Sequence, residues 1–406
     1  MQGFRKRTSV AEALAILAAR TGPLPDEEVA LAEAGGRVIA VDVVAAMSVP
    51  HFARSAMDGY AVVGESTFGA TVYAPIELVV VGDARPGRAS ASPMRHGEAV
   101  RITTGAPIPE GADAVVMAEH TEETTRSGVV FVRISEPVAP RRHIGQIGED
   151  VVTGTTVVTR GRRLRPQDLG VLASVGVARL AVVRRPSVTL LVTGDELLPP
   201  GSTPTGAHLV DSNSLVVSSL ARRDGAAAVD VVYVPDRHDA VRAALLAARG
   251  DVVLVSGGSS VGPEDHAPIV LAEVGEVAVH GVAVRPASPA GFGFVSRRPV
   301  FLLPGNPVSC MCAYEFFAGP TIRAMGGLPR AWPHKTRTAL LATKLVSELG
   351  RVDYVRVRFE GERVVPLMTS GASILSSTTR ADGVVIAGAD HEGFAEGEPV
   401  EVVLFD

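Results

Sequence analysis

The second half of the chain alternates short apolar runs with amphipathic stretches. The apolar runs are rich in β-branched residues, and they lie at 188–192, 229–234, 252–255 and 300–303. Between them, residues near 212–224 and 237–249 carry apolar side chains at helical spacing. Strands that alternate with helices predict a parallel sheet covered by helices on both faces. We therefore expect a three-layer α/β/α domain over residues 186–328.

An amphipathic helix is predicted near the start of the chain, at residues 8–20. Val10 and Leu17 fall on its apolar stripe. Ser9 and Glu12 have the spacing of a capping box, which favours a folded helix over a signal peptide.

The remaining regions predict a multidomain chain, α/β with additional β-rich domains. Short β-rich runs alternate with Gly and Pro turns after the first apolar stretches, helical patterning returns at 166–175, and short strands resume near the C-terminus. We predict a discontinuous helical N-terminal domain at 1–50 and 150–185, a small β insertion domain at 51–149, the α/β domain at 186–328 and a C-terminal β-barrel-like domain at 329–406.

Composition narrows the class of protein. The chain has 406 residues, of which 46% are hydrophobic, and a net charge of −5. This charge gives no support to nucleic-acid binding, and no apolar run approaches the ~20 residues of a membrane span. Cys310 and Cys312 are the only cysteines, and residues two apart cannot share one helix face. We expect buried thiols in a reducing cytoplasm.

A glycine-containing turn follows the central apolar run. Ser256, Gly257 and Gly258 end that run, and glycines let the backbone turn sharply and approach a ligand. Open α/β sheets bind ligands at the carboxyl ends of their strands, and amides at a helix start favour phosphate. Asp265 follows shortly afterwards, either as the N-cap of the next helix or as a functional acid.

Acidic residues follow neighbouring predicted strands. Glu196, Asp236 and Asp265 each follow a different strand, so we expect them at one edge of the sheet. Carboxylates there can hold Mg²⁺ together with substrate phosphates. Helix capping stays open for Asp236 and Asp265, whereas Glu196 is a poor cap. His266 is expected at the surface or behind the site, because no His/Cys cluster has zinc-ligand spacing.

These motifs together resemble the molybdopterin molybdenumtransferase family, which includes the catalytic portion of the scaffold protein gephyrin. The resemblance covers nearly the whole chain, with the motifs in the family's order. They are Ser55-Ala-Met-Asp-Gly-Tyr-Ala61, the stretch from Ile102 to Met117, Gly148-Glu-Asp150, Thr193-Gly-Asp-Glu-Leu197, Asp211-Ser-Asn213, the stretch from Ser256 to Asp265, and Leu303-Pro-Gly-Asn-Pro-Val-Ser309.

The resemblance implies a molybdopterin molybdotransferase of molybdenum cofactor biosynthesis. Such an enzyme hydrolyses adenylated molybdopterin and inserts molybdenum from molybdate at the dithiolene sulfurs. The implied protein is an elongated homodimer of four-domain subunits that uses Mg²⁺, with an adenylyltransferase as a partner. Residues 186–328 would be its molybdopterin-binding domain.

The resemblance also implies site residues. Asp58, Thr104 and Asp150 of one subunit would face the three strand-end acids of the other. The implied catalytic residues are Asp58, Glu196, Asp236 and Asp265, with Glu196 and Asp265 as metal ligands. The implied substrate-binding residues are Thr104, Gly105, Asp150, Thr193, Gly194, Ser212, Asn213, Ser256, Gly257, Gly258, Arg285, Pro304, Gly305 and Asn306.

Short segments depart from the family pattern. The family usually has Lys-Pro-Gly-Lys-Pro where this chain has Arg285-Pro-Ala-Ser-Pro289, it has basic residues near Gly145, and it has Val in place of Ser259. A lost charge-assisted contact weakens binding by roughly 1.5–3 kcal/mol. We therefore predict adenylate hydrolysis combined with weak binding of molybdate.

Other functions stay open. An adenylyltransferase shares the α/β domain and its Gly-Gly loop, but it does not need the motifs around Asp58 and Thr104. A non-catalytic paralogue that binds molybdopterin or a partner protein would tolerate the missing basic residues.

Overall fold

The computed structural model describes residues 7–91, 93–258, 265–368 and 371–405. Over this described part, the chain splits into two compact units. The insertion unit runs from Glu28 to Ala181, and the main unit combines the residues up to Glu27 with those from Val182 onward. None of the helices formed by the described residues is long and apolar enough to cross a membrane.

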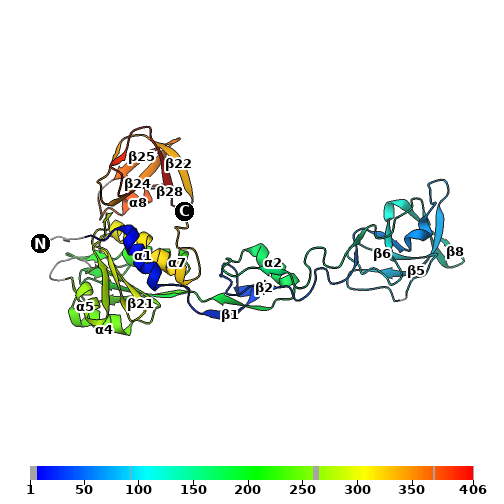
Figure 1. Cartoon of the computed structure of the whole chain (residues 1–406), viewed down its shortest axis with the longest axis horizontal. Helices are drawn as coiled ribbons and strands as arrows, with labels where there is room; N and C mark the ends of the chain where they lie inside the picture. The colour runs from blue at the N-terminus through cyan, green and yellow to red at the C-terminus, as the bar shows by residue number, and fades with distance from the viewer. Residues whose placement is uncertain (1–6, 92, 259–264, 369–370, 406) are drawn as a thin grey trace. The chain divides into compact units, whose positions relative to one another are not determined.

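A mixed sheet forms the centre of the main unit (Figure 1). Its strand order is β16 (Ala228–Val234), β13 (Ser187–Thr193), β17 (Val252–Ser256), β21 (Arg298–Leu303), β20 (Gly291–Val295) and β18 (Glu276–His280). The first four strands are parallel, as predicted, but β20 and β18 run antiparallel to their neighbours. The predicted parallel arrangement is thus confirmed for the four predicted strands, and the sheet continues in an antiparallel edge, where a short turn rather than a crossover helix joins β20 to β21.

Helices cover both faces of this sheet. One face carries α4 (His238–Ala247) and α5 (His266–Val274), and the other carries α3 (Asn213–Arg223) and α6 (Pro307–Ala313). Side chains alternate along β17. Val252 and Leu254 pack into the core on the face covered by α3 and α6, whereas Val253 and Val255 pack into the core on the face covered by α4 and α5. This alternation explains why the strand is apolar throughout. After α6 the chain continues through a π-helical turn (Tyr314–Ala318) into α7 (Gly319–Met325).

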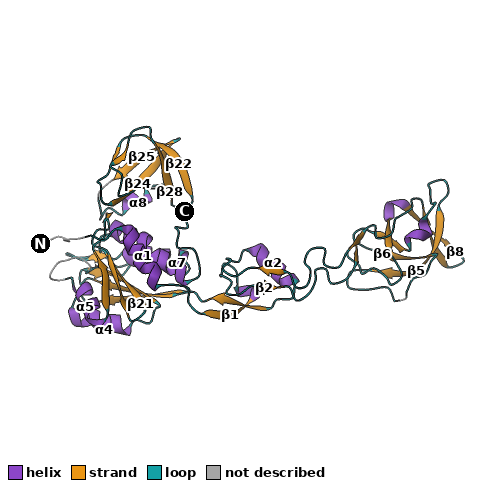
Figure 2. Cartoon of the chain, viewed as in Figure 1, coloured by secondary structure: helices purple, strands orange, loops and turns teal. Residues whose placement is uncertain are grey.

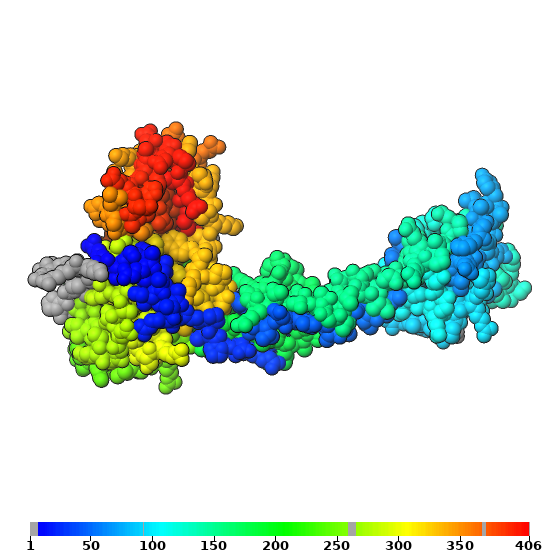
Figure 3. All heavy atoms as spheres, in the orientation of Figure 1, coloured from blue at the N-terminus to red at the C-terminus, as the bar shows by residue number. Residues whose placement is uncertain are grey.

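The predicted first helix forms as α1 (Val10–Arg20), but it belongs to the main unit. Ser9 Oγ accepts the N–H of Glu12 at 3.2 Å, as the capping signal predicted. Ala13 and Leu17 are fully buried in the core that also contains Leu190. Figure 3 shows this helix, in dark blue, packed against residues of the main unit. The contacts of this segment therefore place it with the main unit.

The C-terminal part of the main unit is a closed β-barrel, as predicted. Its strands are β22 (Thr336–Leu341), β24 (Val352–Glu360), β25 (Arg363–Met368), β26 (Gly383–Ala387) and β28 (Pro399–Leu404), with the helix α8 (Ser376–Thr379) between β25 and β26. The β24–β26 pairing closes the barrel. The short strand β19 (Val284–Arg285) comes from the α/β part and pairs with β24.

The insertion unit is rich in strands and turns, as the sequence indicated (Figure 2). Its main sheet has the order β7 (Ala114–Met117), β4 (Gly59–Val62), β6 (Glu98–Ile102), β5 (Ile76–Ala84), β9 (Val129–Ile134) and β8 (Thr121–Arg126). The helix α2 (Pro166–Ser174) lies where helical patterning was predicted. The strands β2 (Val43–Val44) and β11 (Thr156–Val158) pair with each other, as do β3 (Arg54–Ser55) and β10 (Ile144–Gly145). The predicted domain bounds stay predictions.

Candidate functional site

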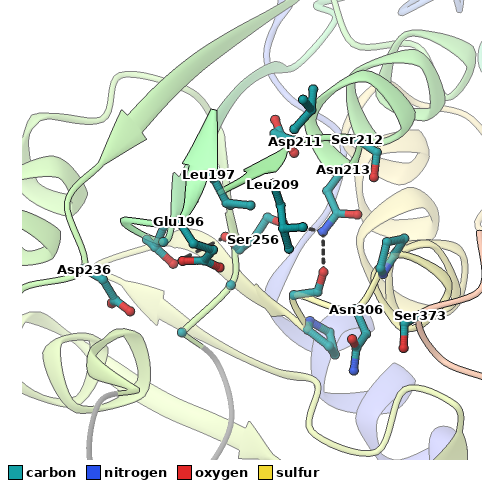
Figure 4. Close-up of a pocket in the computed structure, with 18 of the residues that line it drawn as sticks. Glu196, Leu197, Leu209, Asp211, Ser212, Asn213, Asp236, Ser256, Asn306 and Ser373 are labelled. Carbon is teal, nitrogen blue, oxygen red and sulfur yellow. Dashed lines mark hydrogen bonds between the residues drawn. The ribbon is translucent and has the colours of Figure 1, made fainter. Parts of the chain in front are cut away.

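A cavity of about 570 Å³ opens at the carboxyl ends of β13, β17 and β21 (Figure 4). Most substrate-site residues predicted in the main unit line it. The lining residues are Thr193, Gly194, Glu196, Leu197, Leu209, Val210, Asp211, Ser212, Asn213, Asp236, Ser256, Gly257, Gly258, Asp265, Pro289, Pro304, Gly305, Asn306, Pro307 and Ser373. The strand-end rule therefore predicted residues that do line one cavity.

The Gly257 turn needs glycine for steric reasons. Gly257 has φ +96°, and a Cβ atom there would lie 2.4 Å from the carbonyl oxygen of Thr193. Its N–H donates to the carbonyl of Leu303 at 3.1 Å. The backbone of β17 can thus pass close to both neighbouring strands as it enters the cavity.

Asn213 connects the loops that form the floor of the cavity through side-chain hydrogen bonds. Its Nδ2 donates to Ser256 Oγ at 3.1 Å and to the Gly305 carbonyl at 2.8 Å, as the dashed lines in Figure 4 show. Both amide hydrogens therefore have partners within the protein. Only the Oδ1 atom of Asn213 is left for the predicted contact with a substrate.

The predicted strand-end acids meet at the cavity. Glu196, Asp236 and Asp265 all line it. The capping alternative is not supported for Asp236, because Arg237 occupies the N-cap position of α4. Asp265 does occupy the N-cap position of α5, but its side chain makes no capping hydrogen bond.

Asp236 has the most unusual surroundings of these acids. Its Oδ1 atom is buried and has no hydrogen-bond partner within the described part of the chain. Burial raises the pKa of the Asp236 carboxyl, and the negative charges of Asp195, Glu196 and Asp265 raise it further, against the opposing effect of His266. A buried carboxylate oxygen that has no hydrogen-bond partner among the described residues, near other acids, suits a bound cation.

This acidic cavity fits Mg²⁺ better than a transition metal. The described residues contain no group of three or more His, Cys, Asp or Glu side chains close enough to hold a metal alone. Mg²⁺ needs few protein ligands because it retains waters and binds substrate phosphates. No Arg, Lys or His is found among the described residues that line the cavity, so an anionic substrate would need a cation there.

The structure adds residues that sequence reasoning missed. Asp211 lines the cavity, and its carboxylate accepts the N–H of Ser214 at 3.1 Å and the hydroxyl of Tyr233 at 2.9 Å. The feature of the sequence that could have identified Asp211 was its position just before a predicted helix. Leu209, in the short strand β15 (Leu209–Val210), and Ser373 carried no such signal, because single exposed leucines and serines are common on protein surfaces.

Another group of predicted residues lies in the insertion unit. Asp58 Oδ1 accepts the N–H of Thr104 at 2.6 Å and its Oγ1 hydroxyl at 2.9 Å. These hydrogen bonds lower the pKa of the exposed Asp58 carboxyl. Gly105 has φ +81°, and its N–H donates to the Ser55 carbonyl at 2.8 Å. The exposed Asp150 is anchored through its backbone N–H, which donates to the carbonyl of Val49 at 3.1 Å.

Comparison with known proteins decides the family. Residues 8–176 match the model of the MoeA N-terminal region (domains I and II), 189–324 that of a probable molybdopterin binding domain, and 338–405 that of the MoeA C-terminal region (domain IV). A molybdopterin molybdenumtransferase from Haemophilus influenzae is 32% identical over 95% of this chain and 95% of its own length. The chain belongs to the molybdopterin molybdenumtransferase family.

Other members of the molybdopterin molybdenumtransferase family agree in length and fold. Molybdopterin molybdenumtransferase 2 from Mycobacterium tuberculosis is 38% identical over 81% of this chain and 82% of its own length. The crystal structure of a molybdopterin biosynthesis MoeA protein from Pyrococcus horikoshii superposes with a TM-score of 0.85. That protein is 32% identical, and the alignment covers 99% of this chain and 100% of the other.

The departures from the molybdopterin molybdenumtransferase family pattern have structural correlates. Arg285 forms an ion pair with Asp353 and does not line the cavity, so the geometry does not support its predicted contact with substrate. Ser288 Oγ donates to the carbonyl of Val284 at 2.9 Å. At Gly145, a Cβ atom would lie 2.9 Å from the carboxylate of Glu149. Ser259 lies outside the described residues.

Proposed function

We propose that this chain inserts molybdenum from molybdate into adenylated molybdopterin, with hydrolysis of the adenylate and release of AMP. Family membership over nearly the full length supports an enzyme of molybdenum cofactor biosynthesis. The observation that carries the proposal is the meeting of Glu196, Asp236 and Asp265 beside the Gly257 turn. Carboxylates beside a turn whose backbone can lie close to a ligand suit a phosphate-containing substrate that binds together with a cation.

The cavity suits both parts of such a substrate. Leu197, Leu209 and Pro289 provide apolar wall for a flat ring system. The polar floor around Asn213 and Gly257 faces the carboxylates, where the phosphates would lie. A bicyclic pterin with a phosphate tail has this same division between apolar and charged parts.

Glu196 and Asp265 would hold the Mg²⁺ ion. When bound, the ion would neutralise charge on the phosphates and polarise the bond that is hydrolysed. Asp236 would accept the proton of the attacking water, because a raised pKa improves a carboxylate as a base near neutral pH. The residues of the cavity floor would keep the adenylate fixed relative to Asp236.

The assembly is part of the proposal. The working form would be a cytoplasmic homodimer in which Asp58, Thr104 and Asp150 of one subunit complete the site of the other. The paired and exposed Asp58 carboxylate supports a role in chemistry, because it contributes little to packing. An adenylyltransferase would supply the adenylated substrate.

Incubation of the purified chain with adenylated molybdopterin, Mg²⁺ and molybdate tests the proposal. AMP release together with active cofactor is the expected result. Binding of the substrate without AMP release would instead identify a non-catalytic paralogue. Formation of the adenylate from molybdopterin and ATP would identify an adenylyltransferase.

A further inference from the structure

Asp195 lies beside the cavity without lining it. Gly194 and Glu196, its neighbours in the chain, both line the cavity. The Asp195 carboxylate turns instead toward the adjacent loop, where its Oδ1 accepts the backbone N–H of Asp236 at 3.1 Å. The side chain of Asp195 therefore acts on the backbone of another acid.

This hydrogen bond joins the loops that follow β13 and β16. β16 is an edge strand and has β13 as its hydrogen-bonded neighbour in the sheet. The loop that carries Asp236 consequently has a strand beside it on one side only. The Asp195 bond supplies a fixed point where the sheet gives little support. It lies directly at the residue whose Oδ1 is buried with no hydrogen-bond partner in the described part of the chain.

The local backbone directs Asp195 and Glu196 to different places. Gly194 has φ +139°, and a Cβ atom there would lie 2.7 Å from Glu196 Oε2. The glycine thus lets the Glu196 carboxylate fold back toward the cavity while Asp195 points to Asp236.

An acid at this position has an electrostatic cost. Asp195 adds a negative charge to a site that already contains Glu196, Asp236 and Asp265, and like charges repel. A carboxylate, however, accepts a stronger hydrogen bond from an amide than a neutral oxygen does. The hydrogen bond to the Asp236 N–H therefore explains why residue 195 is an acid although its side chain does not line the cavity.

We propose that Asp195 is a positioning residue that holds Asp236 in the orientation needed for adenylate hydrolysis. This inference rests on the proposed function. A displacement of about 1 Å at a reacting group can lower a rate by roughly 10²-fold. Loss of the Asp195 bond should therefore lower kcat much more than it changes KM.

The test compares Asp195→Ala with Asp195→Asn, because Asn can still accept the Asp236 N–H. We expect Asp195→Ala to lower kcat for AMP release at least tenfold, and Asp195→Asn to stay within about threefold of wild type, with KM changed less than threefold in both. Asp230→Ala, which removes an exposed acid from β16, is the matched control. Wild-type kcat in Asp195→Ala, or equal losses in both variants, would overturn the inference.

Hydrogen exchange provides a measurement that does not depend on turnover. The Asp236 amide should exchange slowly in wild type and Asp195→Asn, and at least tenfold faster in Asp195→Ala. Equal exchange in all of them would show that the bond does not restrain the loop. If wild type restrains this amide but releases no AMP, the proposed function fails while the positioning contact stands.

Discussion

Arg285 forms an ion pair with Asp353, with 2.5 Å between the guanidinium nitrogen and the carboxylate oxygen. The pair joins β19 of the α/β part to β24 of the barrel, where these residues are also register partners. Asp353 is buried and additionally accepts hydrogen bonds from Ser347 and Arg351. The positive charge of Arg285 thus serves a connection within the main unit.

Ser288→Lys should strengthen molybdate binding. In wild type, the segment Arg285-Pro-Ala-Ser-Pro289 contains no unpaired cation. Arg285 is paired with Asp353, and the Ser288 hydroxyl donates to the carbonyl of Val284. An added ammonium would supply a charge-assisted contact, so the molybdate concentration for half-maximal insertion should fall about 10- to 100-fold. The effect should be largest at low salt. Ser288→Gln is the uncharged control, and no change in Ser288→Lys would show that molybdate draws its positive charge from elsewhere.

Asp58→Ala should abolish AMP release and leave thermal stability nearly unchanged. Asp58 is exposed and bonded to Thr104, so its removal creates no cavity. Thr104→Val removes the hydroxyl bond but keeps the backbone N–H, and we expect an intermediate loss of activity. Activity assays beside melting curves check both variants. A large drop in melting temperature with normal turnover would identify Asp58 as a structural residue.

Mixing two inactive variants tests the proposed homodimer. Asp58→Ala and Asp265→Ala would each be inactive alone, but a mixed dimer would contain one site with both acids intact. Random exchange of subunits would restore about a quarter of the sites. Light scattering should show a dimer. An active monomer, or a dimer that gains no activity after verified exchange, would contradict the shared site.

The Asp251 carboxylate should stabilise the folded main unit at neutral pH and lose this effect at acidic pH. Its carboxylate accepts two hydrogen bonds from Arg184, at 2.7 and 2.9 Å, and others from the backbone and hydroxyl of Ser187. Burial alone would raise its pKa, but these partners outweigh burial and lower the pKa to about 2, from an ordinary 3.8. A lowered pKa stabilises the folded state above the unfolded value, and this contribution is lost as pH falls from about 4 to about 2.

The matching variant is Asp251→Asn. It should lower the free energy of unfolding of the main unit by about 2 kcal/mol at pH 7, and the difference from wild type should shrink below pH 4. Denaturant titrations at pH 7 and pH 3 measure this difference. Asp239→Asn changes an exposed acid of α4 and should have little effect. A difference that does not depend on pH would exclude the charge of Asp251 as its cause.

Cys310 and Cys312 should resist thiol reagents in the folded protein. Burial raises the pKa of Cys310 to about 12 and that of Cys312 well above its ordinary value. Both thiols therefore stay protonated and covered at pH 8. We expect no labelling of the native chain within an hour, and labelling of both cysteines in guanidinium chloride. Fast native labelling would show that α6 opens readily.

The sequence predicted the central strands and the acidic site for a clear physical reason. A run such as Val252–Ser256 is apolar at every position only when both faces are covered, and parallel strands bring their carboxyl ends to one edge. The grouping of Glu196, Asp236 and Asp265 could therefore be predicted from the sequence alone. The antiparallel edge was missed because an apolar run does not reveal the direction of its neighbour.

Pairings between distant segments could not be predicted in the same way. The stripe of α1 indicated that one face is buried, but not that Leu17 packs with Leu190. Arg285 was interpreted as a substrate ligand from the family resemblance, and its pairing with Asp353, 68 residues later, carries no local signal in the sequence. Ser373 reaches the cavity from the barrel part, which the spacing of a motif cannot show.

The position of α1 has a consequence for the order of folding during synthesis. A ribosome makes this helix before the insertion unit, yet Ala13 and Leu17 pack against strands that emerge only after that whole unit. The insertion unit can therefore fold while α1 still waits with its apolar stripe exposed to water. Contacts of such long sequence separation form slowly. The newly made helix α1 thus needs protection, by a chaperone or the ribosome surface, until the sheet is complete.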